Sequence, residues 1–163
     1  MVRILKKNRR GAAAVEMAIV LPLLLMLTLG AIRYGWLFLK AQQITNAARY
    51  GARIAILPNS TNNDVEQAIR DLFALVNIPY IAGETVSYST PVEDPDTGDV
   101  EYVPIDNISY DEEGKAYSVG FPITVTVTVP HENVDIMVVQ FVTELEPDGW
   151  PLGASTTMTK EGP

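Results

Sequence analysis

The sequence contains no cysteine and a single histidine, His131. Without cysteine the chain has no disulfide framework, no cysteine-based zinc site and no thiol nucleophile. One histidine leaves no material for a histidine-based catalytic triad or a multi-histidine metal site. The glycines of the N-terminal third are scattered and form no phosphate-binding loop. We therefore expect neither an enzyme nor a bound cofactor.

Positive charge is scarce in the larger, C-terminal part of the chain. From Ile54 to Pro163 there are three basic residues against nineteen acidic ones, a net charge of −16. Nucleic-acid binding depends on clustered lysine and arginine, so we expect no nucleic-acid partner. A field of this sign also disfavours acidic neighbours and therefore influences partner choice.

One acidic stretch, Glu93–Glu101, has the composition of an ion-binding loop. Alternating carboxylates around a glycine can supply oxygen ligands to Ca²⁺, and the candidates are Asp94, Asp96, Asp99 and Glu101. The stretch lacks the full twelve-residue pattern of a calcium loop. A solvated hairpin tip is the other interpretation, and no other metal site is expected.

The N-terminus combines a basic cluster with a long apolar run. Five basic residues and no acidic one precede Gly11, and Ala12–Ile32 follows with 21 residues and one charge, Glu16. As a helix this run is about 32 Å long, close to the roughly 30 Å of bilayer hydrocarbon. Because basic residues gather on the cytoplasmic side, we expect one membrane span with Met1 in the cytoplasm. Residues after about 40 are expected outside the cytoplasmic membrane.

Aromatic and basic side chains are mixed directly after the apolar run. The mixture comprises Arg33, Tyr34, Trp36, Phe38 and Lys40. Aromatic rings and long cations of this kind are favoured at a membrane–water interface. The sequence therefore predicts that this stretch lies where the membrane ends.

Three interpretations of the N-terminal segment are open. An ordinary cleaved signal peptide has a shorter apolar core and then a small-x-small cleavage site, which does not appear after Ile32. An uncleaved signal anchor fits the hydropathy, but it leaves Gly11 and Glu16 unexplained. In a prepilin-type signal, cleavage follows Gly11 on the cytoplasmic side, and the mature protein begins at Ala12 with the apolar helix retained.

The prepilin-type interpretation gives Glu16 a role. A charge inside a bilayer is unfavourable unless it is neutralised. When helices pack side by side, the carboxylate of Glu16 can neutralise the new α-amino group of Ala12 in a neighbouring subunit, which also sets the axial register. Pro22 removes the helical hydrogen bond to the Ala18 carbonyl, so we expect it to bend the helix.

Four sequence elements form one pattern: the basic junction at Gly11, Glu16, the run Ala18-x-x-x-Pro22, and Asn46-Ala-Ala-Arg-Tyr-Gly-Ala-Arg53. This pattern, over about residues 8–56, resembles the N-terminus of TadE-like proteins. These are the pseudopilins of tight-adherence (Flp-type) pilus assembly systems. Met17 is a departure, because related sequences usually carry an aromatic residue at this position.

The resemblance implies a set of partners and a location. It implies maturation by a prepilin peptidase, and contacts with other pilin or pseudopilin subunits and with the pilus assembly platform. It implies a single-pass protein of the bacterial cytoplasmic (inner) membrane with an extracytoplasmic head, and a place in a surface filament remains open. Major subunits of this pilus class are typically far shorter than this chain.

Beyond the membrane segment, no strong helix breaker appears before Pro58. This predicts one helix from about Ala12 to about Leu57, roughly 69 Å long. Its outer half carries a stripe of small residues on one face. We expect this stripe to pack on the protein's own sheet rather than against another subunit. The stripe comprises Ala47, Ala48, Gly51, Ala52 and Ala55.

A second helix is predicted over Val65–Asn77, with Asp64 as N-cap and Gln67 as its capping-box partner. From Pro79 onward the residues alternate with a period of two, which predicts strands. The strand at Gly120–Val129 should be central in an antiparallel sheet, and Val134–Leu145 is open between strand and helix. The other predicted strands are Thr85–Thr90, Glu101–Ile105 and Ala154–Lys160, with a hairpin turn at Asp94–Gly98.

The predicted fold class is α+β with a pilin-like architecture: a long N-terminal transmembrane helix packed on a small antiparallel sheet, with one short extra helix. We divide the chain into a basic leader (1–11), a transmembrane and assembly helix (12–32), its extracytoplasmic continuation (33–57) and a head (58–163). The predicted function is that of a membrane-anchored pseudopilin, a minor subunit matured after Gly11. The alternatives are an uncleaved, signal-anchored binding or adhesion module, an enzyme held at the membrane, and a major filament subunit.

Overall fold

One long helix dominates the molecule. The computed structural model describes residues 9–95, 97–110, 114–130, 133–134 and 151–161. Helix α1, Arg9–Ala55, runs through 47 residues, which corresponds to about 70 Å. The prediction of a single helix from about Ala12 to about Leu57 is confirmed. Pro22 lies inside α1 without interrupting it, and the bend expected there stays a prediction.

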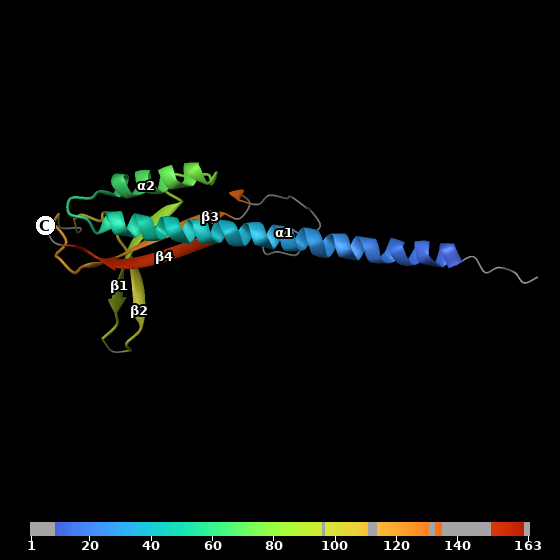
Figure 1. The fold of residues 1–163 in the computed structure, drawn as a ribbon. Coiled ribbons are helices and arrows are strands. Elements are labelled where there is room, and N and C mark those ends of the chain that lie inside the picture. The colour runs from blue at the N-terminus through green and yellow to red at the C-terminus, as the bar shows by residue number, and fades with distance from the viewer. Residues whose placement is uncertain (1–8, 96, 111–113, 131–132, 135–150, 162–163) are drawn as a thin grey trace, which may run out of the picture.

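The two halves of α1 differ in what surrounds them. The described side chains from Gly11 to Leu29 are all exposed, and burial begins at Arg33. Figure 1 shows the other helices and strands gathered around the C-terminal half of α1, while the N-terminal half extends beyond them. Among the described residues, α1 is the one helix long and apolar enough to cross a membrane. The apolar stretch of α1 that meets this condition is not buried against the other described residues.

Helix α2, Asn62–Leu75, begins one turn earlier than the sequence predicts. Its N-cap is Thr61, so the prediction of Asp64 as N-cap and Gln67 as its partner is wrong. The Thr61 side chain accepts a hydrogen bond from the Asp64 amide, and the Thr61 amide donates to Asp64 Oδ2 at 2.8 Å. Both members of a capping box are therefore satisfied within Thr61–Asp64.

Four strands form an antiparallel sheet in the order β2-β1-β3-β4. Their bounds are Val86–Glu93 (β1), Val100–Pro104 (β2), Pro122–Pro130 (β3) and Pro151–Thr159 (β4). The predicted central strand is confirmed, because β3 pairs with β1 on one side and with β4 on the other. The α+β class is confirmed with it. The predicted hairpin between β1 and β2 is present and is closed by hydrogen bonds between Asp94 and Asp99 and between Gly98 and Asp94.

The core lies where α1 packs against α2 and against β3 and β4. On β3, the alternate side chains Ile123, Val125, Val127 and Val129 are buried as predicted. The same buried cluster includes Ile44 of α1 and Val65, Ile69 and Phe73 of α2. The core thus fixes the head to the C-terminal half of α1 and leaves the N-terminal half out.

The small-residue stripe of α1 lies inside this core, where α1 packs against α2 as well as against the sheet, so the prediction of packing on the sheet is confirmed only in part. Ala47, Ala48, Ala52 and Ala55 are each at most 1% exposed. Gly51 faces α2, and a Cβ atom added to it would lie 2.7 Å from Ile69 Cδ1. The absence of a side chain at Gly51 therefore lets the two helices approach this closely.

Some predictions concern residues that the structure does not describe. His131, residues 135–145 of the ambiguous apolar stretch, and Asp96 of the acidic loop lie outside the described residues. Their predicted conformations and roles stay predictions.

Candidate assembly surface

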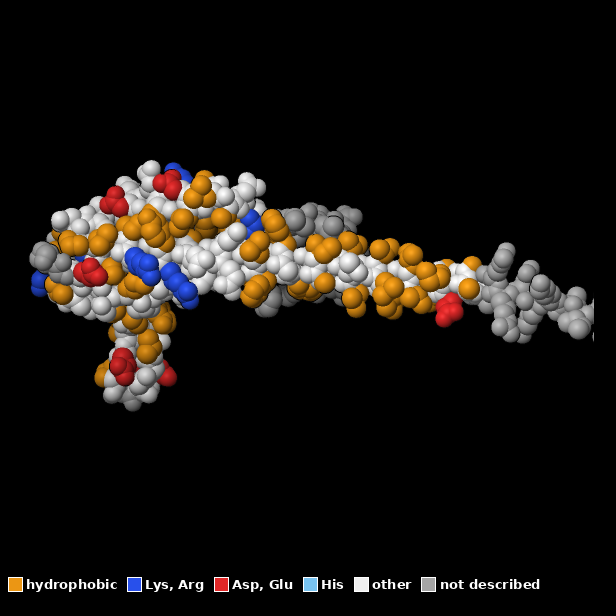
Figure 2. Space-filling model, in the orientation of Figure 1, with side chains coloured by type: hydrophobic (Ala, Val, Ile, Leu, Met, Phe, Trp, Pro, Cys, Tyr) orange, Lys and Arg blue, Asp and Glu red, His pale blue; other side chains and the backbone are white. Residues whose placement is uncertain are grey.

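The N-terminal half of α1 is an apolar surface on which no other described part of the chain packs. Side chains pointing in different directions around the helix are more than 60% exposed: Val15, Met17, Ile19, Leu23 and Leu27. Figure 2 shows this half of the helix covered by hydrophobic side chains on the viewed face. A helix that is apolar all round is stable in lipid or against other apolar helices.

The predicted processing and assembly residues lie together at the start of this surface. Gly11 and Ala12 belong to the first turn of α1, and Glu16 follows Ala12 by four residues, on the same helix face. Glu16 is exposed, as is Gly11, and a side chain at Gly11 would meet nothing within 4 Å. The junction is thus accessible, and a carboxylate lies one turn beyond it.

Further along α1, Trp36 and Lys40 form hydrogen bonds with the head. The Trp36 indole Nε1 donates a hydrogen bond to the Val134 carbonyl at 2.7 Å. Lys40 Nζ donates to the carbonyl of Val76, the C-cap residue of α2, and lies 4.8 Å from the centre of the Trp36 ring. The last turn of α2 has no basic residue of its own, so Lys40 supplies the positive charge that a helix C-terminus favours.

The prediction that this stretch lies where the membrane ends stays a prediction. Arg33 and Lys40 are each only 3% exposed, and Lys40 is bonded to α2. Burial lowers the pKa of the Lys40 ammonium. Tyr34 and Phe38, in contrast, are 61% and 67% exposed and remain available to an interface. A hydrogen bond spanning 36 residues has no signature in the sequence, which is why the pattern missed it.

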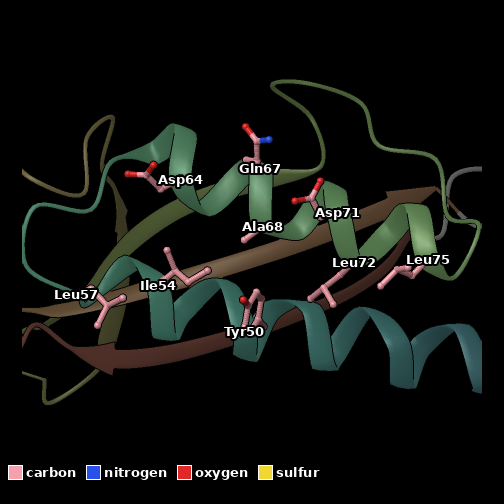
Figure 3. Close-up of a pocket in the computed structure, with 9 residues that line it drawn as sticks. All are labelled: Tyr50, Ile54, Leu57, Asp64, Gln67, Ala68, Asp71, Leu72 and Leu75. Carbon is pink, nitrogen blue, oxygen red and sulfur yellow. The ribbon is translucent and has the colours of Figure 1, made fainter.

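A groove of about 520 Å³ runs between α1 and α2 on the head. Figure 3 shows Tyr50 and Ile54 of α1 and Leu72 and Leu75 of α2 in the space between the two helices, with Gln67 and Asp71 on the outer side of α2. Leu75 is 82% exposed. The sequence placed these residues in two predicted helices but did not predict a groove between them.

The acidic loop projects at the end of the β1–β2 hairpin. Asp94, Asp99 and Glu101 are exposed, while Asp96 lies outside the described residues. Within the described part of the chain, no three histidine, cysteine or acidic side chains are grouped so that they could hold a metal ion. The calcium prediction needs Asp96 and stays untested.

Comparison with known proteins identifies the N-terminal segment. Residues 11–53 match the family model of the TadE-like protein. The resemblance to this family is therefore confirmed over a segment that contains Gly11, Glu16 and Pro22 and that ends two residues before the end of α1. No curated protein and no solved structure matches the chain.

The match has a direct structural meaning. The TadE-like family is associated with pilus assembly, and the matched segment is almost the whole of α1. The helix carrying the match is the one able to cross a membrane. Together these findings fit a membrane protein associated with a tight-adherence pilus system.

Proposed function

We propose that the chain is a membrane-anchored pseudopilin, a minor pilin-like subunit in the assembly of a tight-adherence-type pilus or a related secretion system. A prepilin peptidase cleaves after Gly11, and Ala12 becomes the first residue of the mature protein. The observation that carries the proposal is the uncovered apolar half of α1 with one carboxylate, Glu16, a single turn beyond the cleavage site.

The uncovered half of α1 serves in two environments. Before assembly it is the membrane anchor, and lipid surrounds its apolar side chains. In an assembly the same side chains pack against the helices of neighbouring subunits. Because the head is fastened to α1 from Trp36 onward, the first half of the helix can exchange lipid for protein without unfolding the head.

Glu16 acts when α1 packs against the helices of neighbouring subunits. An isolated carboxylate and an isolated ammonium are each unfavourable among alkyl groups. Cleavage creates an α-amino group on Ala12, and a contact between this group in one copy and Glu16 in the next neutralises both charges. Since the pair forms at one axial offset only, it fixes the register between subunits.

The proposed function also assigns a location to each segment of the chain. Residues 1–11 are the cytoplasmic leader, residues 12–32 cross the inner membrane, and residues 33–57 with the head lie outside the cytoplasm. The partners are the prepilin peptidase, other pilin or pseudopilin subunits and the assembly platform. The bulky head, with its four-stranded sheet and second helix, supports a minor rather than a major subunit.

The intact mass of the protein extracted from membranes tests this proposal. In cells that contain the peptidase, we expect the loss of Met1–Gly11 and an N-terminal Ala12; in cells without it, the full chain. Gly11→Leu should keep the leader in both strains. Because a side chain at this position meets nothing within 4 Å, retention would reflect failed recognition and not misfolding.

A full-length protein in peptidase-containing cells would remove the proposal. It would leave the uncleaved, signal-anchored binding or adhesion module as the function of the chain, because that alternative needs the same helix but no cut.

A further inference from the structure

The β1–β2 hairpin forms an arm that stands away from the rest of the head (Figure 1). All five residues of β2 are exposed, and in the described residues no strand pairs with its outer edge. Val100 and Tyr102 are each 55% exposed. A two-stranded ribbon with apolar side chains in water is marginal by itself. The arm is therefore a surface that another protein surface would stabilise.

Both faces of the arm combine apolar side chains with a glutamate. The register pairs Pro91 with Tyr102 and Glu93 with Val100, so these four residues share one face. On the other face Val92 pairs with Glu101, next to the pair Thr90 and Val103. Glu93 and Glu101 are exposed. The end of the arm is thus apolar and negatively charged at once.

The head carries a complementary surface on α1. Arg49 and Arg53 are exposed and lie one helical turn apart. No acidic residue occurs between Met17 and Asn63, so neither arginine has an acidic neighbour along α1. Tyr50 and Ile54, their immediate neighbours in the sequence, line the groove between α1 and α2. A basic pair therefore borders an apolar groove on a head that is otherwise strongly acidic.

The arm and the basic pair lie at the same height along α1. The arm leaves the body beside the C-terminal end of the helix (Figure 1), and Arg49 and Arg53 belong to its last two turns. Figure 2 shows basic side chains over this end of α1 and acidic side chains at the end of the arm. For copies standing side by side with parallel α1 helices, the arm of one copy is level with the basic pair of the next.

We propose that the β1–β2 arm of one copy docks on the α1–α2 groove of a second copy of this chain, with the acidic end of the arm, which carries Glu93 on one face and Glu101 on the other, placed over Arg49 and Arg53. The contact rests on the proposed function only in that it needs copies inserted side by side in one direction. Apolar side chains of the arm enter the groove, where Tyr50 is 45% and Leu75 82% exposed.

Charge also selects the orientation of the arm. Arg49 and Arg53 make the border of the groove basic on α1. On α2 the border is acidic, because Asp64 and Asp71 line the groove there. The acidic end of the arm is attracted to the first border and repelled by the second. The arm therefore lies with its glutamates over α1, and a reversed arm is disfavoured.

Cross-linking in native membranes tests the contact. The chain has no cysteine, so two introduced cysteines react without background from the protein itself. One tagged copy carries Val100→Cys on the arm, and a second, differently tagged copy carries Tyr50→Cys in the groove. With a short bismaleimide in cells that contain the peptidase, we expect a cross-linked dimer bearing both tags. As a matched control, Glu84→Cys, exposed in the loop before β1, should cross-link to Tyr50→Cys at background level.

A charge-swap cycle separates docking from mere proximity. We expect E93K/E101K on the arm copy, or R49E/R53E on the groove copy, to lower the cross-link yield roughly tenfold, since each replaces exposed attraction by repulsion. Combining both swaps should restore most of the yield.

Two results would overturn the docking contact: equal yields for Val100→Cys and Glu84→Cys, or a swap cycle without recovery. If the N-terminus is Ala12 in the same sample, the docking contact alone has failed. If Met1–Gly11 is retained, the proposed function has failed, whatever the cross-link yield.

Discussion

At the scale of single residues, two positions of α1 are explained by what they meet. Gly51 is the point at which α2 approaches closely, and Ile69 fills the space that a side chain would need. Glu16 is exposed on the part of α1 that the head does not cover, and in the proposed function its role depends on a partner. Gly51 therefore serves the fold of a single copy, whereas Glu16 is proposed to serve contacts between copies.

Gly51→Val should destabilise the head by about 1–3 kcal/mol, because the added methyl groups enter space held by the buried Ile69 and Val65. Gly35→Val is the matched control: it changes glycine to the same residue in the same helix, but a Cβ at Gly35 meets nothing within 4 Å. Thermal unfolding of the full chain in detergent measures both. An equal loss in the two variants would show that helix propensity, and not the α1–α2 contact, is responsible.

Glu16→Ala should leave membrane insertion unchanged or improve it, because it removes a charge from the apolar segment. The same change should strongly impair assembly, since the amino group of a neighbouring Ala12 then stays unpaired. The fraction of the protein recovered in assembled complexes, set against the fraction in membranes, separates the two effects. Met17→Ala, at the adjacent and 62% exposed position, is the control that should assemble normally. Normal assembly of Glu16→Ala would count against the pairing.

At the scale of elements, hydrogen bonds at both ends of α2 hold this helix in place. Its first turn is closed by Thr61 and Asp64, and its C-cap carbonyl accepts a hydrogen bond from Lys40 of α1. The Asn62 side chain also accepts from the Ile108 amide at 3.0 Å and donates to the Asp106 carbonyl at 2.7 Å. These contacts tie α2 to α1 and to the loop after β2.

The cap of α2 makes the head sensitive to acid. Hydrogen bonds from the amide and hydroxyl of Thr61 lower the pKa of the Asp64 carboxyl below its usual 3.8. A carboxyl with a lowered folded-state pKa stabilises the fold above its unfolded-state pKa, and this contribution is lost as the pH falls through the folded-state value. Unfolding midpoints measured between about pH 6 and pH 2 should therefore fall less steeply for Asp64→Asn than for the unchanged chain.

Asp71→Asn removes the same charge two turns further along α2 and is the control for this experiment. Its acid dependence should follow that of the unchanged chain. If Asp64→Asn and Asp71→Asn gave the same profile, the Thr61–Asp64 cap would not be the acid-sensitive contact.

Local pattern predicted the elements, but long-range contacts determined the details. The absence of a strong helix breaker along most of α1 and the period of two residues in β3 are properties of the local sequence, so both elements could be predicted. The start of α2 could not be predicted, because Thr61–Asp64 and Asp64–Gln67 both fit a capping box. The structure uses Thr61–Asp64, and the Asn62 side chain then forms hydrogen bonds with residues 106 and 108, which are distant in the sequence. The burial of Lys40 depends on Val76, and the groove depends on how α1 and α2 approach.

At the scale of the whole molecule, the chain divides its surfaces between two tasks. The core holds the head to the C-terminal half of α1, so neither task disturbs the fold. In the proposed function the N-terminal half of α1 anchors the chain and then packs against other copies, and the arm and groove of the head lie at the far end of the same helix. Contacts at both ends of one continuous helix would fix the relative position of two copies.

A zero-length cross-link tests the central claim, which is that the Glu16 carboxylate of one copy meets the Ala12 amino group of another. Assemblies made from a mixture of unlabelled and heavy-isotope-labelled protein are treated with a membrane-permeant carbodiimide, and the N-terminal peptides are analysed by mass spectrometry. The account predicts an amide bond between Ala12 and Glu16 in peptide pairs that combine both isotopes. Bonds formed only within single-isotope pairs, or none in protein that begins at Ala12, would contradict it.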